Sequence, residues 1–535
     1  MQQDQKFYEK FFSKYPVGIH DSASRFLAVS SLLRGRVLDL ACGTGTLSKY
    51  YTGEYVGIDW AGSAIKKAEE VRRPDARFMQ LDVVTHTIVF PHLFDSAYLG
   101  EFLEHIENDE KVFENVLKNV KPDGLLVVTV PNADRVPDES HCRIFTVASI
   151  RRDYSKYGKV RFHSWSGERD RILFSIELGQ HPEDEMTLVM ICKDEAKGIE
   201  AAILSALPIV DRVVVSVDSK TTDKTKEIAM FYADEVKEHV WEDDFSKARN
   251  FAQEGVKSKW ILFLDGHEYI ESTGDALVKM KDDVDGIFVT VKMESGMTFL
   301  YPRIFRSHIK FKNKVHNVNE CKTRRCAPDF VIVHDRMNLQ SEDAVKRRNE
   351  QREKMLPAAM RAQIKENPKN ARAWFHLANF HMMRHETDDA ISEYKKVVKY
   401  GKSPDEVFLS LLHLGALQQQ KDQWLRALWN FEKAARLMPD RWESDRVLGG
   451  YYYLHKNFKK ALPHLVEALR PNKRRYAYQP MQQNFVETWD MIGQSFAQLD
   501  EFEAAKLAWI RAQKFSTDEA KKAYFEEKIK LVSQI

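Results

Sequence analysis

Residues 241–268 read WEDDFSKARNFAQEGVKSKWILFLDGHE, and this stretch decides most about the fold. Within it, WILFLD at 260–265 has the length and apolar character of a buried strand, and it ends in an acidic cluster. Arg249 and Asn250 precede the strand and add a planar cation and an amide. Because arginine pairs well with phosphate oxygens, the segment suits the binding of a nucleoside diphosphate.

Further apolar runs of strand length lie on both sides of this segment. They alternate with helical stretches, one beginning near Ala196 and one at 224–232, which is typical of an α/β domain. We place this domain at 185–342. Its other expected strands are TLVMIC at 187–192, RVVVSVD at 212–218 and GIFVTVKM at 286–293.

The N-terminal part of the chain repeats this alternation and predicts a separate doubly wound, Rossmann-like α/β domain at 1–180. The polar, proline-containing stretch QHPEDE at 180–185 marks its boundary. The expected strands of this first domain are VLDLA at 37–41, YVGID at 55–59, DSAYL at 95–99 and LLVVTV at 125–130.

The last third of the chain has a period of about 34 residues, which resembles tetratricopeptide repeats and predicts an all-α solenoid at 371–535. A charged segment at 343–370 predicts a linker helix before it, and 517–535 a capping helix after the last unit. Small residues at fixed positions let paired helices approach closely, and aromatic residues fill the spaces between them. The matching positions are Trp374, Leu377, Ala390 and Tyr394; Leu414, Gly415, Ala427, Phe431, Ala434 and Pro439; Leu448, Gly449, Tyr452, Ala461 and Ala468; and Trp489, Gly493, Phe496, Ala505, Trp509 and Ala512.

Composition narrows the class of protein. The 81 basic and 79 acidic residues leave a net charge of +2, which argues against a general attraction to nucleic acids or membranes. The sequence has no signal-peptide pattern and no apolar run of about 18 residues, so we expect neither a leader nor a membrane span. The five scattered cysteines predict reduced thiols and a cytoplasmic protein.

The first candidate site lies in the loop after the strand at 37–41. Gly43 and Gly45 in this loop allow the backbone to approach a ligand closely. Asp59 ends the next strand, where a carboxylate can accept both hydroxyls of a ribose. Asp82, after the third strand, can reach an adenine amine.

This pattern resembles the class I S-adenosylmethionine-dependent methyltransferases, and the resemblance covers 1–180. FDSAYLGEFLEHIEND, which begins at Phe94, is similar to the fourth-strand motif of that family. The resemblance implies S-adenosylmethionine as a cofactor. It implies contacts to this methyl donor at Asp39, Gly43, Gly45, Asp59 and Asp82.

Glu101, Glu104 and His105 follow the fourth expected strand, where a methyl acceptor would bind. Methyl transfer needs an aligned donor and acceptor, and it needs a base when the acceptor is a hydroxyl. Related small-molecule O-methyltransferases use an acidic Glu-His segment near this point, so Glu101 and His105 are the catalytic candidates. Glu104 and His105 have the alternative role of ordinary helix-start residues. For the whole domain, the alternatives are a generic dinucleotide fold and an inactive methyltransferase kept as a scaffold.

The motif order of the second domain resembles the family 2 glycosyltransferases of the GT-A type, over 186–340. Asp218 ends the second strand, where its carboxylate can accept a hydrogen bond from the imide N–H of a nucleotide base. Arg249 can pair with diphosphate oxygens, and Asn250 can bond to sugar or phosphate. The residues expected along the nucleotide also include Lys193, Asp194 and Glu195.

The resemblance also implies a divalent metal that neutralises the departing diphosphate. The Asp-x-Asp cluster of that family reads Asp265-Gly-His267-Glu268 here, so an imidazole replaces the second carboxylate. Imidazole suits manganese better than magnesium, so manganese is favoured, with magnesium or a loss of metal use as alternatives. A later segment, YPRIFRSHIKFKNKVHNVNE, resembles the one that returns a histidine to the metal and indicates His316.

An inverting transfer, which the family predicts, requires a general base for the acceptor. Asp244 and Glu294 are the candidates, and the sequence does not choose between them. Asp243 and Asp244 have the alternative role of shaping the loop before the Arg-Asn helix.

These observations predict a bifunctional enzyme. It would transfer a sugar from a nucleotide donor, with uridine-type donors favoured, and would methylate the sugar or the acceptor. VIVHDRMNLQSEDAVKRRNEQREKMLPAAM, which begins at Val331, resembles family 2 enzymes fused to tetratricopeptide repeats, in which the repeats hold a protein or glycan acceptor or build a dimer. The formation of a homo-oligomer is therefore one of the alternatives.

Two other function classes are weighed. In the first, the chain is a scaffold or adaptor with one or both catalytic domains silent. In the second, it modifies nucleic-acid bases, which the near-neutral charge disfavours. The local support for that second class is a basic loop containing Lys473, Arg474, Arg475, Tyr476 and Tyr478.

Overall fold

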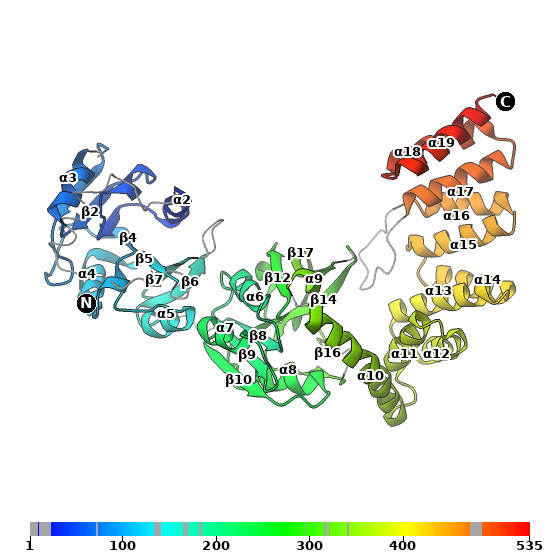
Figure 1. The fold of residues 1–535 in the computed structure, drawn as a ribbon, viewed down its shortest axis with the longest axis horizontal. Coiled ribbons are helices and arrows are strands. Elements are labelled where there is room, and N and C mark those ends of the chain that lie inside the picture. The colour runs from blue at the N-terminus through cyan, green and yellow to red at the C-terminus, as the bar shows by residue number, and fades with distance from the viewer. Residues whose placement is uncertain are drawn as a thin grey trace.

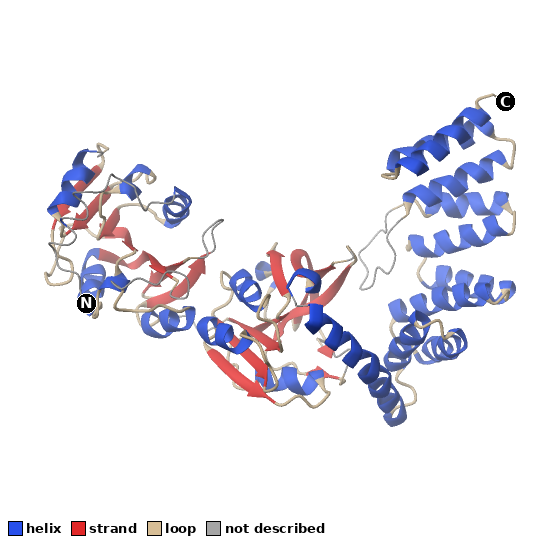
Figure 2. Ribbon diagram, in the orientation of Figure 1, coloured by secondary structure: helices blue, strands red, loops and turns tan. Residues whose placement is uncertain are grey.

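The computed structural model describes residues 9, 23–70, 73–132, 141–163, 170–180, 185–294, 296–314, 318–319, 321–339, 342–470 and 484–534. Two sheet-containing units come first along the chain, and a stack of helices follows (Figure 1). Strands are confined to the first two units (Figure 2). None of the helices in the described part of the chain is long and apolar enough to cross a membrane.

The first sheet begins with parallel strands and ends with an antiparallel edge. Its central strands are buried because their side chains are apolar on both faces, and helices cover them. In the described residues its strand order is β3 (Ala76–Gln80), β2 (Tyr55–Asp59), β1 (Val37–Leu40), β4 (Phe94–Gly100), β5 (Val120–Pro131), β7 (Arg171–Leu178) and β6 (Gly158–His163). The helices of this unit are α2 (Ala23–Leu32), α3 (Gly62–Glu70), α4 (Glu110–Asn119) and α5 (Val147–Tyr154), with short turns η1 (Thr46–Lys49) and η2 (Leu103–His105).

The second sheet also combines a parallel half with a mixed half. In the described residues its strand order is β10 (Glu235–His239), β9 (Arg212–Asp218), β8 (Met186–Cys192), β11 (Trp260–Asp265), β14 (Thr298–Arg306), β13 (Gly286–Met293), β17 (Arg324–His334) and β12 (Glu268–Ser272). Strand β14 runs antiparallel to β11 and starts the mixed half. The remaining elements are α6 (Ile199–Ala206), α7 (Thr225–Tyr232), α8 (Phe245–Gln253), η3 (Leu277–Lys279), α9 (Arg336–Leu339) and the small pair β15 (Phe311–Lys312) and β16 (Val318–Asn319).

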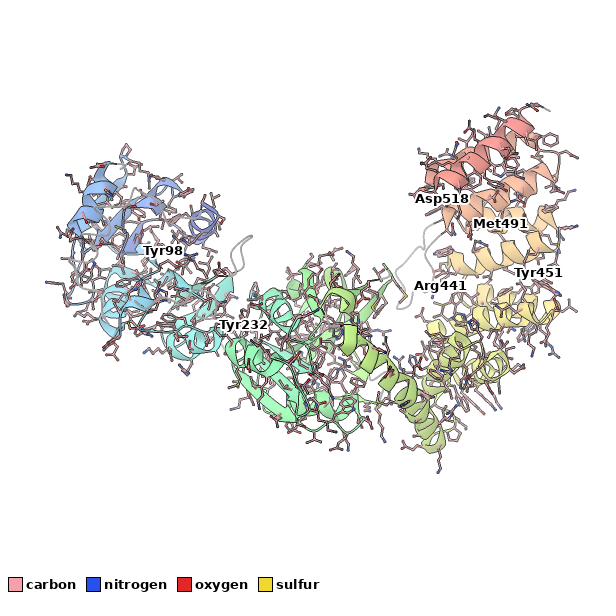
Figure 3. The ribbon with its side chains drawn as sticks, in the orientation of Figure 1. Tyr98, Tyr232, Arg441, Tyr451, Met491 and Asp518 are labelled. Carbon is pink, nitrogen blue, oxygen red and sulfur yellow. The ribbon has the colours of Figure 1, made fainter. Side chains whose placement is uncertain are left out.

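The two α/β units pack against each other. Their buried apolar side chains form one continuous cluster, and α5 contacts α7 across the junction. Across the junction, Arg151 Nη1 lies 2.6 Å from Asp234 Oδ2, and its Nη2 donates to the Val210 carbonyl at 3.1 Å. Lys159 Nζ pairs with Asp211 Oδ1 at 2.8 Å. Tyr232, labelled in Figure 3, lies at the same junction.

Helix α10 (Glu342–Glu366) runs from the second unit to the helical stack. The stack consists of antiparallel helix pairs, and each helix packs on its neighbour in sequence. Gly415 and Gly493 sit where a Cβ would overlap the rings of Phe431 and Trp509, so the close approach requires glycine. The helices are α11 (Ala371–Met383), α12 (Thr387–Tyr400), α13 (Pro404–Gln420), α14 (Trp424–Leu437), α15 (Trp442–Leu454), α16 (Phe458–Glu467), α17 (Phe485–Ala497), α18 (Phe502–Phe515) and α19 (Glu519–Val532).

A buried cation joins consecutive repeats. Arg441 is fully buried (Figure 3), and its guanidinium pairs with Glu443 at 2.6 Å and with Asp405 at 3.1 Å. The same group lies over the Phe408 ring, 4.4 Å from its centroid. The carboxylates on two helices therefore share one guanidinium, which aligns α13 with α15.

The predicted fold class of two α/β units and a helical solenoid is confirmed. The strands β10, β12, β14 and β17 were not among the expected ones because polar residues interrupt their apolar pattern. The predicted domain boundaries at 180, 185, 342 and 370 stay predictions. The basic loop at 473–478 lies outside the described residues.

We expect Arg151→Ala to destabilise the two α/β units by about 3 kcal/mol, because it leaves the partly buried Asp234 carboxylate without its cation. The neighbouring Arg152 is the matched control, since its side chain is 74% exposed and pairs with the adjacent Asp153. Arg152→Ala should change stability by less than about 0.5 kcal/mol. Calorimetric unfolding of both variants tests this, and equal midpoints would show that the junction is not held by the ion pair.

Candidate functional site

In each sheet the order of the strands changes direction at the first strand of the unit, so that later strands lie on both sides of it. In the first sheet β1 lies between β2 and β4, and in the second β8 lies between β9 and β11. The four strands β10, β9, β8 and β11 are parallel, as are β3, β2, β1, β4 and β5. Loops at the carboxyl ends of such strands form a crevice at this switch point, where ligands bind in open α/β sheets.

The glycine loop after β1 is held by Asp59. One carboxylate oxygen of Asp59 accepts from the Gly43 N–H at 2.9 Å, and the other accepts from the Ala61 N–H at 2.9 Å. Gly45 has a φ of 69°, and a Cβ there would overlap the Phe78 ring. Asp59 is buried, and this burial raises its pKa to about 6. The structure therefore brings the predicted loop and the predicted ribose carboxylate together.

Asp39 and Asp82, the other two carboxylates predicted to contact the methyl donor, differ in their surroundings. Asp39 is buried within β1 itself and accepts a hydrogen bond from the Tyr55 hydroxyl. Asp82 follows β3 and accepts from the Val84 N–H at 2.8 Å and from the Thr85 hydroxyl. Asp39 thus links two neighbouring strands, whereas Asp82 organises the loop from which it projects.

Glu101 lies directly after β4 in a left-handed backbone conformation, with φ of 51°. Its carboxylate accepts from Arg171 Nε at 2.8 Å, and Arg25 Nη1 lies 3.7 Å away. A non-glycine residue in this region of φ is strained, and such residues concentrate at functional sites. Neither arginine was anticipated, because 70 or more positions separate each of them from Glu101 in sequence.

Glu104 and His105 occupy the short turn η2. Glu104 is 1% exposed, whereas the His105 side chain is 24% exposed. Burial, together with the charge of Glu101, raises the pKa of Glu104 well above its usual range. The predicted catalytic pair Glu101 and His105 therefore lies at the same sheet edge as the glycine loop.

In the second unit, the ends of β8 and β9 are joined by charged groups. Lys193 Nζ lies 2.9 Å from Asp218 Oδ2, and Asp218 Oδ1 accepts from the Lys220 N–H at 3.0 Å. Although burial opposes ionisation, these two interactions lower the pKa of Asp218. Asp194, with φ of 52°, accepts from the Thr222 N–H at 2.8 Å. The side chains predicted to line the nucleotide base thus lie at the ends of β8 and β9, where hydrogen bonds and an ion pair hold them.

Asp265 ends β11 between two guanidinium groups. Arg249 Nη2 donates to Asp265 Oδ1 at 3.1 Å, and Arg303 Nη2 lies 3.9 Å from Oδ2. Burial opposes ionisation, but the charges of these arginines hold the pKa of Asp265 well below its usual range. Glu268 is fully buried beside them, where it pairs with Arg303 and lies 2.8 Å from His334 Nδ1.

His267 is buried between groups from two other loops. Its Nδ1 lies 3.0 Å from Glu195 Oε1, and its Nε2 accepts from Arg336 Nε at 3.3 Å. Its ring is 4.5 Å from that of His334. Glu195 was predicted to line the nucleotide; its carboxylate lies against the His267 imidazole, and the nucleotide contact stays a prediction.

The donor set at Asp265 and His267 does not fit a divalent cation as it stands. A metal bound here would have to displace Arg249 from Asp265 and would lie close to the cationic Arg303 and Arg336. His316, the third predicted ligand, lies outside the described residues.

Two predicted residues are used by the fold itself. Both ends of the Asn250 amide bond to the Phe311 backbone, at 3.0 and 2.8 Å. Asp244 caps α8 by accepting from Ser246 and Lys247 N–H groups at 2.9 and 3.1 Å. This capping was the alternative role expected for Asp244. The direct roles of Asn250 at the donor and of Asp244 as a base stay predictions without support from these contacts.

Glu294, the other candidate base, is exposed at the end of β13. Its carboxylate accepts from the Arg336 N–H, and the Arg336 side chain in turn reaches His267. Sequence reasoning missed Arg303, His334 and Arg336, because their two segments were interpreted for His316 and for the connection to the repeats instead. They join the site only through β14, β17 and α9.

Two family models match the α/β units. Residues 12–175 match the family described as methyltransferase domain, and residues 187–338 match glycosyl transferase family 2. The two matches together cover the residues of both candidate sites.

Individual proteins are similar to shorter stretches. A TPR repeat-containing protein of Synechococcus elongatus is 30% identical over 142 residues, which are 25% of this chain and 35% of that protein. The prophage-derived glycosyltransferase SunS of Bacillus subtilis is 27% identical over 262 residues, or 45% of this chain and 60% of SunS. Demethylmenaquinone methyltransferase of Renibacterium salmoninarum is 32% identical over 104 residues, or 19% of this chain and 43% of that enzyme.

The chain spans between 35% and 60% of the length of these three relatives. The chain therefore combines a methyltransferase domain, a family 2 glycosyltransferase domain and helical repeats of the tetratricopeptide type.

Proposed function

We propose that the chain is a bifunctional transferase that moves a sugar from a nucleotide donor and methylates the sugar or its acceptor. The observation that carries this proposal is the gathering of Lys193, Asp218, Arg249 and Asp265 at one sheet edge. These residues fall within the segment matched by glycosyl transferase family 2, and the glycine loop falls within the segment matched by the methyltransferase family.

The donor would lie along the ends of β9, β8 and β11. The Asp218 carboxylate would accept from the N–H of a uracil- or thymine-type base, with Lys193 shielding its charge. Arg249 would pair with the diphosphate through its planar fork, since its side chain is held against Asp265 and over the Phe263 ring at 4.7 Å. A uridine-linked sugar is the favoured donor on this basis.

Arginine charge supports departure of the diphosphate in this arrangement. Arg249, Arg303 and Arg336 all approach Asp265 or His267. Preoriented cations stabilise developing phosphate charge without reorganisation during the reaction. The predicted manganese site at Asp265, His267 and His316 is the competing proposal, with magnesium as its variant.

Glu294 is the general base that the geometry supports better. It is exposed to an incoming acceptor and tied through Arg336 to His267, whereas Asp244 is buried under the N–H groups that it caps.

The methyl donor would be S-adenosylmethionine, bound by the loop at Gly43 and Gly45. Asp59 already holds this loop, and the same carboxylate would accept hydrogen bonds from the ribose hydroxyls. Asp39 and Asp82 would complete the contacts to the donor from the neighbouring strand and loop.

The repeats would hold a protein or glycan acceptor, or a second copy of the chain. Each repeat stacks on the next through paired helices, which leaves an extended surface of the kind used to bind peptides. The free state of all five cysteines is compatible with a cytoplasmic protein.

We expect Asp265→Ala to lower nucleotide release from a nucleotide sugar by at least about 100-fold, because Arg249 loses its anchor at the diphosphate. The same variant should bind S-adenosylmethionine normally in a calorimeter. Asp59→Ala is the reciprocal variant, which should weaken S-adenosylmethionine binding and leave nucleotide release intact. A panel of uridine- and thymidine-linked sugars gives the donor, and equal loss of both activities in either variant would exclude separate sites.

Nucleotide release by the wild-type protein should persist in EDTA within about twofold of its rate in manganese, since arginines supply the positive charge. The reaction is followed by the amount of free nucleotide over time, with each metal added back separately. Loss of activity in EDTA that manganese restores and magnesium does not would support the competing metal site instead.

Glu294→Gln should lower kcat by about 100-fold or more while the Kd for the nucleotide sugar stays unchanged, because a base acts on the acceptor alone. Asp244→Asn is the comparison: it should mainly lower the stability of the domain, by about 1 kcal/mol, through a weaker cap. If Asp244→Asn stops turnover in a folded protein while Glu294→Gln does not, the base is Asp244.

A further inference from the structure

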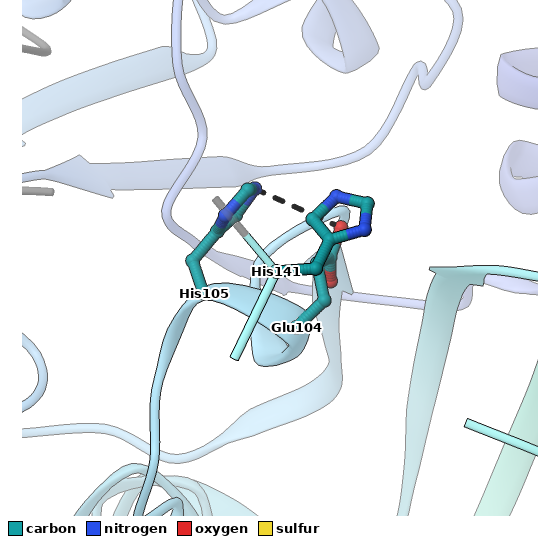
Figure 4. Close-up of side chains that lie close together, drawn as sticks. All are labelled: Glu104, His105 and His141. Carbon is teal, nitrogen blue, oxygen red and sulfur yellow. Dashed lines mark ion pairs between the residues drawn. The ribbon is translucent and has the colours of Figure 1, made fainter. Parts of the chain in front are cut away.

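We propose that Glu104, His105 and His141 form a binding site for a divalent transition-metal ion in the methyltransferase domain. One carboxylate oxygen and one ring nitrogen from each histidine lie within 4.8 Å of one another. Figure 4 shows the two imidazoles and the carboxylate close together, with the His105–Glu104 pair as a dashed line. The site is distinct from the predicted metal position at Asp265, which belongs to the other domain.

The two chain segments that supply these ligands are tied together by the backbone. The Glu104 carbonyl accepts from the Cys142 N–H at 2.9 Å and from the Arg143 N–H at 3.3 Å. Arg143 Nη1 also pairs with Asp109 Oδ2 at 2.7 Å, which anchors the second segment to the start of α4. His141 is therefore held beside η2 by the residues that follow it, and the three side chains are brought together by the fold.

Glu104 carries an incomplete set of partners for a buried carboxylate. It is 1% exposed, and its Oε2 has no hydrogen-bond partner among the described residues. The His105 ring lies nearby, with Nε2 at 3.9 Å from Oε1, beyond hydrogen-bond distance. Burying a carboxylate oxygen without a donor is costly, so a cation between Glu104 and the two rings would satisfy the Oε2 atom, which has no partner among the described residues.

The ligand types favour a particular class of ion. Two imidazoles and one carboxylate suit zinc, and three protein ligands leave a coordination position open, as in catalytic zinc sites. Magnesium and calcium prefer oxygen ligands alone and fit less well. The ring centroids of His105 and His141 are 5.1 Å apart and inclined by 62°, so the rings do not stack and their nitrogens can turn toward one ion.

The position of the site suggests what would fill its open coordination position. Glu104 and His105 follow β4, and β4 is hydrogen-bonded to β1, which carries the glycine loop. A bound ion would thus lie at the sheet edge where the methyl donor is proposed to bind. We infer that it holds a hydroxyl oxygen of the methyl acceptor, and this second part rests on the proposed methyl transfer. A bound divalent ion makes a hydroxyl more acidic.

Titration of the EDTA-treated, dialysed full-length protein with zinc chloride tests the metal site by calorimetry. We expect one zinc ion per chain in the wild type. Glu104→Gln and His141→Ala should weaken binding by at least about 100-fold, because each removes a ligand. His92→Ala is the matched control, since His92 is an exposed histidine of the same domain; it should leave the affinity unchanged.

Thermal unfolding and cobalt absorption give readouts that do not depend on activity. Zinc should raise the unfolding midpoint of the wild type and of His92→Ala but not of the two ligand variants, because only a folded site binds it. Cobalt should give visible absorption bands in the same two proteins. Equal zinc affinity in all four proteins, or no rise in the midpoint of the wild type, would overturn the site.

The acceptor role is tested separately, with S-adenosylmethionine and a hydroxyl-bearing sugar acceptor. Methyl transfer should fall in EDTA and return with zinc, while S-adenosylmethionine binding stays constant. Zinc binding with metal-independent methyl transfer would overturn the acceptor role and leave the site. If S-adenosylmethionine does not bind at all, the proposed methyl transfer fails, and the calorimetric result still decides the metal site.

Discussion

The direction of the parallel strands is the constraint on which both candidate sites depend. Because β1, β2 and β4 run the same way, the loops after them meet at one edge of the first sheet, and the same holds for β8, β9 and β11 in the second. Side chains that lie far apart in sequence thereby converge without any direct requirement on their spacing. The glycine loop, Asp59 and Glu101 gather in this way, as do Lys193, Asp218 and Asp265.

Ion pairs hold the side chains of the glycosyltransferase site, whereas hydrogen bonds to the backbone hold the glycine loop of the methyltransferase site. Glu268 is buried and Asp265 is partly buried, and they stay ionised because arginines from α8 and β14 surround them. The cost of burying these carboxylates is offset only while the arginines remain in place. This network gathers cations at the site, and His267 is held beside it by Glu195 and Arg336.

The junction between the two α/β units sets how the two proposed activities relate. Arg151 and Lys159 link the units through ion pairs at the rim of a shared apolar cluster, so the units pack as one body. Two sites on one body raise the local concentration of a shared substrate, without any direct transfer between them. The repeats extend this body through α10, and their own alignment depends on buried groups such as Arg441.

Features that are encoded over short distances could be predicted before the structure was known. Apolar runs, the glycines at Gly43 and Gly45, and the repeat period with Gly415 and Gly493 predicted the two α/β units and the solenoid, because each depends on neighbouring residues. The position of Asp59 and of Asp265 at strand ends was predictable for the same reason. Only the tertiary structure decided which side chains meet. Arg171 against Glu101, Arg303 against Glu268, and His141 against Glu104 are contacts between distant segments, and no local pattern marks them. Tertiary packing also gave Asn250 and Asp244 their bonds to the backbone, since a side chain's partners depend on what the fold brings within hydrogen-bond distance.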